Sequence, residues 1–305
     1  MPAALKQIIP LDLQFLGNRG AIAAYLIPHT GGAALVECGP GSTLETLKSG
    51  LADHGYKTTD ITDVLLTHIH LDHAGAAGSL ARAGARIHVH EVGAPHLLDP
   101  EKLLSSAERI YGDQMERLWG EFLAVPADKI EVLRDGQTIE IGNLSFQCFD
   151  TPGHAYHHMV YRFEDLLFTG DIGGVRLQST RHIRLPMPPP EFHLEKWRQS
   201  VQRLVSESQG VRRIAPTHFG IFDDPEWHLA ALQQLVDDVG RWIEKTMQND
   251  PTLETLDAEF TAWTRTRTAQ DGLSEATVAA YEAANPSWMS PLGIQRYWKK
   301  YHQNG

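Results

Sequence analysis

The sequence predicts an α/β fold in which two mixed β-sheets pack face to face between outer helices, an αββα sandwich with a helical C-terminal extension. Three observations predict this arrangement. Strand patterns occur in two separate blocks, helical patterns follow each block, and nearly all of residues 225–302 has a helical pattern. The chain has 305 residues, of which 42% are hydrophobic, and is therefore long enough to bury a large core.

The first block of strands is a predicted β-meander. Apolar runs separated by glycine-containing turns predict strands over residues 11–16, 22–27 and 33–37. The turn Gly39-Pro40-Gly41 ends the meander. Ser42, with Glu45 three residues later, has the spacing of a capping box and predicts a helix that ends near His54.

The next segment leads from a strand into a polar motif and then into helices. An apolar run over 64–66 predicts a buried strand, and helix and strand patterns follow over about 73–83 and 86–90. Residues 91–124 have a helical pattern with one apolar face. Tyr111, Trp119 and Phe122 in this insert would line an apolar pocket, although aromatic residues at helical spacing more often belong to the core.

The second block of strands covers residues 130–133, 138–141, 144–149, 157–163 and 166–169. The proline-rich stretch 184–190 predicts a surface loop, because proline disrupts both helices and central strands. A helix over 191–208 and a strand over 213–215 follow. The prediction is a catalytic domain over 1–224, with a helical insert at about 91–124, and a helical extension over 225–305 that acts as a cap or in oligomerisation.

Composition excludes several classes of function. Lys and Arg number 27 against 38 Asp and Glu, and the resulting net charge of −11 disfavours a nucleic-acid partner. The sequence contains neither a run of about 20 apolar residues nor a secretory signal pattern, so we expect a cytoplasmic protein without a membrane span. Cys38 and Cys148 are too few for a disulfide scaffold and are expected to be buried. The 16 histidines remain to be explained.

The densest histidine cluster is THIHLDHAG at 67–75. His68 and His70 are two residues apart in an extended segment, so both imidazoles point to the same side and suit one ion. Asp72 and His73 follow where the chain turns into a helix, and they suit a second ion nearby. The spacing therefore supplies ligands for two neighbouring metals.

Three further strand ends carry a metal-ligand type of side chain. TPGH places His154 at the tip of a turn, where we expect it to be exposed, FTGD places Asp171 at the end of a strand, and PTHFG places His218 at the end of another. Each position is a weak signal alone. Combined with the first motif and in this order, they favour a metal site.

These motifs resemble those of metallo-β-lactamase-fold hydrolases, including glyoxalase II and lactonase relatives. The resemblance also includes ECGPG at 37–41 and covers about residues 10–222. It implies two metal sites joined by a bridging carboxylate, with His68, His70 and His154 at the first site, Asp72, His73 and His218 at the second, and Asp171 bridging both. Glu37 departs from the pattern, because relatives commonly have Asp there.

The resemblance implies a binuclear zinc hydrolase that uses a metal-bridging hydroxide to cleave an ester-like bond, a thioester or a lactone, of a small molecule. Iron or manganese at one or both sites is the alternative metal content. Asp72 is expected to orient the hydroxide and shuttle its proton. Tyr156, His157 and Arg184 are candidate substrate contacts. Arg184 belongs to a basic group with Arg176, Arg181 and His182 that would suit a carboxylate-bearing substrate.

Other functions remain open at this stage. A mononuclear non-haem iron persulfide dioxygenase shares the fold, but it would leave Asp72, His73 and His218 idle. A binding protein with a closed structural metal site is disfavoured because seven ligands exceed what such a site uses. The net charge disfavours a nuclease, and the lack of an export signal disfavours a β-lactamase. Aromatic residues near the C-terminus also suggest a homo-oligomer formed through the last helices.

Overall fold

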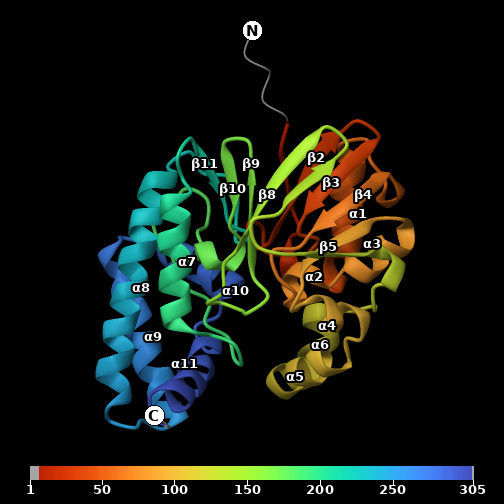
Figure 1. Ribbon diagram of the computed structural model, residues 1–305. Helices are drawn as coiled ribbons and strands as arrows, with labels where there is room; N and C mark the ends of the chain where they lie inside the picture. Colours follow the sequence, from red (N-terminus) through yellow and green to blue (C-terminus); the bar gives the residue numbers. More distant parts are fainter. Residues whose placement is uncertain (1–6, 304–305) are drawn as a thin grey trace.

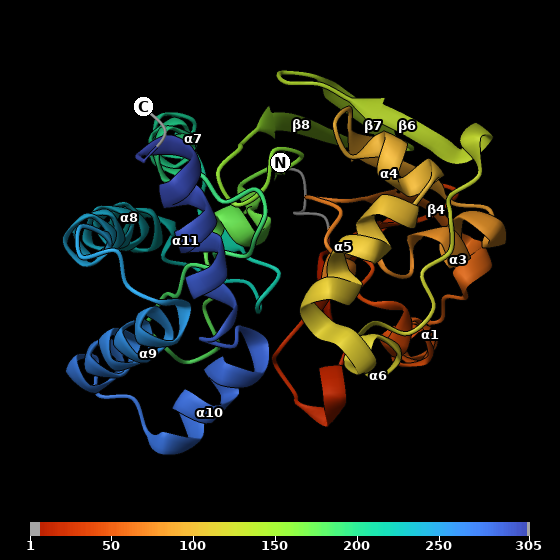
Figure 2. The same ribbon diagram turned by 90° about the horizontal axis from the view of Figure 1, so that it is seen from below.

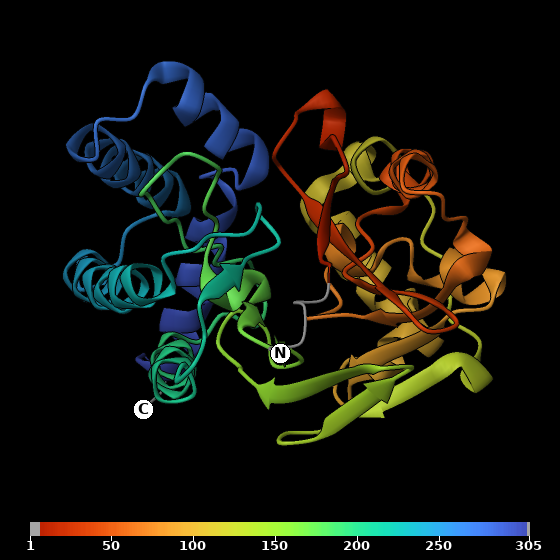
Figure 3. The ribbon, with the colours of Figure 1, turned by 90° about the horizontal axis from the view of Figure 1, so that it is seen from above.

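Two mixed β-sheets lie face to face in the computed structural model, which describes residues 7–303 (Figure 1). Their strand orders are β1-β2-β3-β4-β5-β6 and β11-β10-β9-β8-β7. Seen from above, the two halves of the chain occupy opposite sides of the molecule (Figure 3). Helices cover the outer side of each sheet, which confirms the predicted αββα sandwich.

The first sheet is antiparallel at one end and parallel at the other. Its strands are β1 (Ile9–Asp12), β2 (Ala23–His29), β3 (Gly32–Val36), β4 (Ile61–Leu65), β5 (Arg86–His90) and β6 (Ile130–Leu133). The pairs β1/β2 and β2/β3 are antiparallel, and the pairs from β3 to β6 are parallel. Parallel neighbours need crossover connections, and helix α1 (Leu44–Asp53) lies in the first of these.

The second sheet consists mainly of hairpins. Its strands are β7 (Thr138–Ile141), β8 (Leu144–Asp150), β9 (Met159–Phe163), β10 (Leu166–Phe168) and β11 (Arg213–Ala215). Strands β7 to β10 pair antiparallel, whereas β10 and β11 pair parallel across helix α7 (Leu194–Ser206). The strand ends after β8, β10 and β11 are therefore brought towards one edge of the sandwich.

Buried tyrosines between the sheets hold two of the site loops. The hydroxyl of Tyr25 donates to the carbonyl of Pro216 at 2.6 Å, and that of Tyr161 donates to the carbonyl of Leu66 at 2.6 Å. Burial raises the pKa of both hydroxyls above the usual value, so both remain donors. The two carbonyls precede the segments that carry His68 and His218, so the core positions these loops.

Several local predictions for the first sheet are wrong. Strand β1 ends at Asp12, and a 3₁₀ turn with left-handed backbone at Leu16 follows instead of strand. The predicted capping box is absent within residues 7–303, because the Ser42 hydroxyl donates to the carbonyl of Leu118 at 2.7 Å and the helix begins at Leu44.

The single helix predicted over 73–83 is divided into α2 (Leu71–Ala74) and α3 (Ala77–Ala83). Gly75 lies at the break and packs against the turn before α1. A Cβ at Gly75 would come within 2.6 Å of the backbone nitrogen of Gly41. Only glycine permits this close approach. The amide of Ala76 donates to the carbonyl of Gly39 at 2.9 Å instead of continuing the helix, so the break follows from a contact that helical periodicity does not reveal.

The insert after β5 forms three short helices, α4 (Ala94–Leu98), α5 (Glu101–Tyr111) and α6 (Met115–Trp119). Residues 120–124, predicted as helix, leave the helical conformation at Gly120. The ring of Trp119 stacks on Phe15 with centroids 5.6 Å apart, and Tyr111 packs edge-on against Trp119 at 5.0 Å. The Phe15 contact joins the insert to the 3₁₀ turn after β1, and the Tyr111 contact packs α5 against α6.

The helical extension contains α8 (Pro225–Met247), α9 (Leu253–Gln270), α10 (Glu275–Ala284) and α11 (Met289–Tyr301). Helix α8 packs beside α7, and α9 to α11 lie opposite α5 and α6 (Figure 2). Residues 184–190 form the predicted loop, but all of them except Pro190 are buried, so the predicted surface position is wrong. The reason is tertiary, because Met187 shares a core with Leu232 of α8 and Ile294 of α11.

Both cysteines are free and buried, as predicted. Burial raises the pKa of the Cys148 thiol to about 12 and that of Cys38 well above the usual value. Both thiols are therefore protonated at neutral pH. None of the helices within residues 7–303 is long and apolar enough to cross a membrane.

An ion pair holds the segment beside His218. Arg176 is buried between the rings of Phe222 and Trp227, and its guanidinium donates to both carboxylate oxygens of Asp224 at 2.7 and 3.0 Å. Hydrogen bonds from Arg176 lower the pKa of Asp224 below its usual value. A lowered pKa means that the pair stabilises the fold above about pH 4 and that this contribution is lost as the pH falls through the pKa of the folded protein.

We therefore expect Asp224→Asn to lower the free energy of unfolding at pH 7 by about 2 kcal/mol, less than for a fully buried pair because Asp224 is partly exposed. Urea denaturation measures this, and the difference from the native protein should shrink towards pH 3. Asp223→Asn is the matched control at an exposed neighbouring position. An equal loss in both variants, or no change with pH, would contradict the assigned role.

Candidate metal centre

The seven predicted ligands meet at one edge of the sandwich. Five of them are buried, and two, His70 and Asp72, are partly exposed. Each of them follows a strand or opens a helix at this edge, where β4, β8, β10 and β11 end. His154 was predicted to be exposed, but it is 1% exposed because the ring of Trp197 packs edge-on against it at 5.8 Å. The turn therefore faces inward against α7.

The first group of donors consists of three imidazoles. The Nδ1 atom of His70 lies 3.0 Å from Nε2 of His68 and 2.9 Å from Nε2 of His154. Burial lowers the pKa of His70 to about 4, and burial with neighbouring imidazoles lowers that of His68 well below its usual value. Neutral imidazoles converge here on one point, which is the arrangement that a divalent cation requires.

The second group combines imidazoles with carboxylates. Oδ2 of Asp72 lies 3.6 Å from Nε2 of His73 and 3.4 Å from Nε2 of His218. Asp171 lies between the two groups. Its Oδ2 is 3.5 Å from Nε2 of His154, and its Oδ1 is 3.4 and 3.5 Å from Nε2 of His73 and His218. One oxygen of Asp171 therefore faces each group.

Two buried polar atoms in the centre lack a hydrogen-bond partner within residues 7–303, which bears on whether these residues fit metal ions. Nε2 of His73 and Oδ1 of Asp171 are buried and have no hydrogen-bond partner within the described residues. A buried polar atom without a partner costs about 1–3 kcal/mol, so such atoms usually mark an ion, a water or a functional site. Imidazole and carboxylate donors together suit zinc, iron or manganese. The residues therefore fit a divalent metal site.

The outer nitrogens of two buried ligand imidazoles are held by backbone carbonyls. Nδ1 of His154 lies 2.8 Å from the carbonyl of Pro186, and Nδ1 of His218 lies 2.7 Å from the carbonyl of Ala21. A carbonyl accepts only from a protonated nitrogen, so both imidazoles carry their proton on Nδ1. The Nε2 lone pair of each then points into the centre, as metal binding requires.

Glu37 connects the two halves of the centre. Its buried carboxylate accepts hydrogen bonds from Nδ1 of His73 at 3.0 Å, from the hydroxyl of Thr217 at 3.0 Å and from the hydroxyl of Thr67. The Thr67 hydroxyl in turn lies 3.0 Å from Nδ1 of His68. The longer arm of Glu37 thus reaches ligands of both groups. The sequence indicated that Glu37 is unusual, but not that its carboxylate accepts hydrogen bonds around the metal ligands.

The three candidate substrate contacts have different surroundings. His157 lines the large cavity described below, with Nε2 at 3.4 Å from Glu191. Tyr156 lies against the C-terminal helix, where its hydroxyl is 2.5 Å from that of Tyr301. Arg184 is buried and donates to Glu282 at 2.6 Å. Among the described residues, neither Tyr156 nor Arg184 lines this cavity.

The basic group predicted before the proline-rich loop is neutralised by carboxylates from the helical extension. Arg184 pairs with Glu282 of α10, and His182 lies 2.6 Å from Asp271, just after α9. Arg176 pairs with Asp224 at the start of α8. Arg181 is largely exposed and lies 3.3 Å from Asp224. Burial lowers the pKa of His182, so its contact with Asp271 is a hydrogen bond rather than an ion pair. Every member of the predicted basic group therefore faces a carboxylate of the helical extension or of the residue before it. Its partners are distant in sequence, so the charge cluster alone did not reveal them.

A cavity of about 980 Å³ opens onto the centre. His70, Asp72 and Asp171 line it at one end, together with His154 and His218. The other walls come from α5 and α6 of the insert, from the proline-rich loop and from α10 and α11. Helices α5 and α6 face α10 and α11 across this region (Figure 2). The helical extension therefore completes the cavity as a cap.

Comparison with known proteins gives one family match and several relatives. The family model described as "Metallo-beta-lactamase superfamily" matches residues 17–218. The metallo-beta-lactamase fold-containing protein ST1585 of Sulfurisphaera tokodaii is 29% identical over 146 residues, which are 47% of this chain and 55% of that protein. The chain thus spans about half the length of the curated relatives that it matches.

Two relatives are named as hydrolases of different substrates. Hydroxyacylglutathione hydrolase of Rhodopseudomonas palustris is 27% identical, covering 53% of this chain and 52% of that protein. Ribonuclease Z of Bradyrhizobium diazoefficiens is 30% identical, covering 45% and 44%. The solved structure of a metallo-beta-lactamase family protein from Thermus thermophilus aligns with a TM-score of 0.60 at 23% identity, covering 96% of this chain and 93% of that one. This likeness extends over the helical extension and concerns the fold alone.

Proposed function

Because the chain belongs to the metallo-beta-lactamase superfamily, we propose that it is a binuclear zinc hydrolase that cleaves an ester-like bond, a thioester or a lactone, of a small molecule. The family match and the hydrolase names of two relatives support metal-dependent hydrolysis. The net charge of −11 favours a small molecule over a nucleic acid. Carboxylates neutralise the basic residues near the proline-rich loop, which leaves that region unsuited to a nucleic-acid backbone.

One observation carries the proposal. Two groups of donor atoms share Asp171, whose two carboxylate oxygens face different imidazoles. His68, His70 and His154 would hold the first cation, and Asp72, His73 and His218 would hold the second, with Asp171 between them. A single structural ion would use only one of these groups.

When bound, two divalent cations polarise a carbonyl group and lower the pKa of water towards neutrality. The side chains supply the remaining tasks. Asp72 is 23% exposed at its side chain and faces the cavity, so its carboxylate can accept a proton at one oxygen and pass it to a leaving group. Glu37 and the carbonyls of Pro186 and Ala21 orient the imidazoles.

Metal analysis of the purified protein tests this proposal. We expect about two zinc ions per chain. Chelation should remove the hydrolysis of at least one member of a panel of S-lactoylglutathione, acyl-homoserine lactones, aryl esters, phosphotriesters and nitrocefin. Added zinc should restore it. One iron per chain with oxygen uptake on a persulfide would instead support the mononuclear dioxygenase and overturn the proposal.

A further inference from the structure

The cavity beside the metal centre is apolar over much of its wall. Apolar side chains make up most of its lining, and they come from segments that are distant in sequence. Leu103 and Ile110 belong to α5, Leu118 belongs to α6, and Met187 belongs to the proline-rich loop. Leu292 of α11 contributes from the helical extension. This wall extends the site well beyond the space that an acetyl or lactoyl group would fill.

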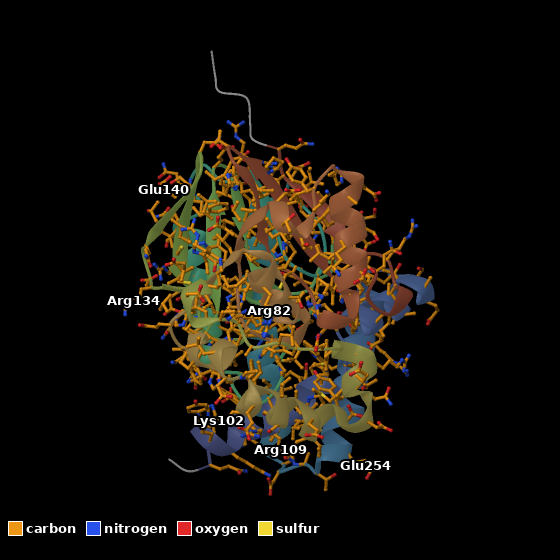
Figure 4. All side chains as sticks on the ribbon, turned by 90° about the vertical axis from the view of Figure 1, so that its right-hand side faces the viewer. Arg82, Lys102, Arg109, Arg134, Glu140 and Glu254 are labelled. Carbon is orange, nitrogen blue, oxygen red and sulfur yellow. The ribbon has the colours of Figure 1, made fainter. Side chains whose placement is uncertain are left out.

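Three charged lining residues are exposed at the outer rim. Lys102, Arg109 and Glu254 line the cavity and are exposed. Figure 4 shows all three near the end of the molecule where the insert faces the helical extension. The cavity therefore has a polar end at the metal centre, exposed charged groups of both signs at its rim and a wall between them that is mostly apolar but also includes the partly buried carboxylates of Glu191, Asp257 and Glu282.

The insert and the helical extension, which form opposite walls of the cavity, contact each other through aromatic rings and a sulfur atom. Tyr111 of α5 packs edge-on against Trp288 at 6.2 Å, and its hydroxyl lies 4.0 Å from the sulfur of Met289. Trp288 is nevertheless half exposed and lines the cavity. Burial raises the pKa of the Tyr111 hydroxyl above its usual value, so it stays neutral. The contact between Tyr111 and the helical extension therefore carries no charge.

We propose that the cavity binds a long acyl chain, so that the substrate is a small-molecule ester, thioester or lactone of a medium- or long-chain fatty acid. This inference rests on the proposed hydrolase function. A volume of about 980 Å³ is large for a small-molecule site. A sugar or nucleotide group would leave its hydroxyls unpaired against the aliphatic wall, whereas each methylene of an alkyl chain loses contact with water there.

A chain-length series tests the inference on the zinc-loaded protein. With p-nitrophenyl esters from acetyl to dodecanoyl, we expect kcat/KM to rise by about fourfold per methylene until the cavity is filled. Hydrolysis that is flat or falls with chain length would overturn the inference and leave the hydrolase proposal intact. Absence of hydrolysis of every ester and thioester would count against the hydrolase proposal, and the binding measurement below then decides on the cavity.

Ligand binding gives a readout that is independent of catalysis. Decanoate added to metal-free protein should shift the tryptophan emission to shorter wavelength, because the chain would cover the half-exposed ring of Trp288. Butyrate at the same concentration should give little change, and Trp288→Phe should reduce the decanoate signal. An absence of decanoate binding, or equal effects of both acids, would overturn the inference.

A matched pair of variants locates the chain in the cavity. Ala283 of α10 is partly exposed and lines the cavity, so Ala283→Phe should place a ring in the space of the acyl chain. The ratio of kcat/KM for the decanoyl ester to that for the acetyl ester should fall by at least about tenfold, because the ring would displace at least two methylenes from the apolar wall. Ala279→Phe, at an exposed position of the same helix, should keep the native ratio. Equal ratios in the two variants would contradict the assigned position.

Discussion

Asp72→Ala is expected to lower turnover by about 10³-fold while one zinc ion per chain is retained, because general acid–base groups contribute about 10²–10⁴-fold. Oδ2 of Asp72 faces Nε2 of His73 and of His218, which both belong to the second donor group. Loss of this carboxylate therefore weakens the second group and leaves the three imidazoles of the first group in place. Steady-state kinetics and metal analysis of the same preparation measure both effects.

A control variant separates this effect from a general loss of acidic charge. Asp113→Ala changes an exposed carboxylate on the insert, outside the residues that line the cavity. We expect it to keep native turnover and zinc content. Full activity in Asp72→Ala would eliminate Asp72 as the proton-transfer group. Loss of both zinc ions would show that the two donor groups are not separable in the way that the geometry indicates.

Glu37→Gln is expected to weaken zinc binding at the second site by about 10–100-fold, the usual effect of losing an outer partner of a metal ligand. The Glu37 carboxylate accepts three side-chain hydrogen bonds and donates none. The amide of Glu37→Gln has one acceptor oxygen and one NH₂ donor. The NH₂ group would face another donor, either Nδ1–H of His73 or a threonine hydroxyl. Competition with a chromophoric chelator measures the affinity of each site.

Two further variants define the role of Glu37. Glu37→Asp keeps an acceptor but shortens the arm, so its affinity should lie between those of the native protein and Glu37→Gln. Thr217→Val removes only one donor and should have the smallest effect. Thermal unfolding with a chelator present checks that each variant still folds without metal. Native zinc affinity in folded Glu37→Gln would show that the carboxylate does not support His73.

Strands with a clear apolar pattern were the elements that could be predicted most closely. The observed bounds of β5, β6, β7 and β11 equal the predicted ones. These segments are short apolar or alternating runs bounded by turn residues or charged positions. Helix breaks were less predictable. The helix breaks after Gly75, where the amide of Ala76 donates to the carbonyl of Gly39, and that contact joins residues distant in sequence.

The ligand groups could also be expected from sequence, because ligand type and spacing follow from coordination chemistry and from the resemblance. The structure brings all seven side chains together, and their assignment to metal sites stays a proposal. It was harder to predict from the sequence which side chains surround a given residue. His154 is covered by Trp197, and Arg184 is paired with Glu282 across 98 positions of sequence. Exposure and pairing depend on which distant segments cover a residue.

The sequence by itself determined the order of strands and helices, the two blocks that form the sandwich and the side chains that converge at its edge. Local periodicity and ligand chemistry are encoded over a few residues, which is why a single chain reveals them. Only the tertiary structure decided that Glu37 supports both donor groups and that the basic residues are neutralised. It also decided that the helical extension forms the cavity wall opposite α5. These features depend on contacts between segments that the sequence separates by tens to hundreds of residues.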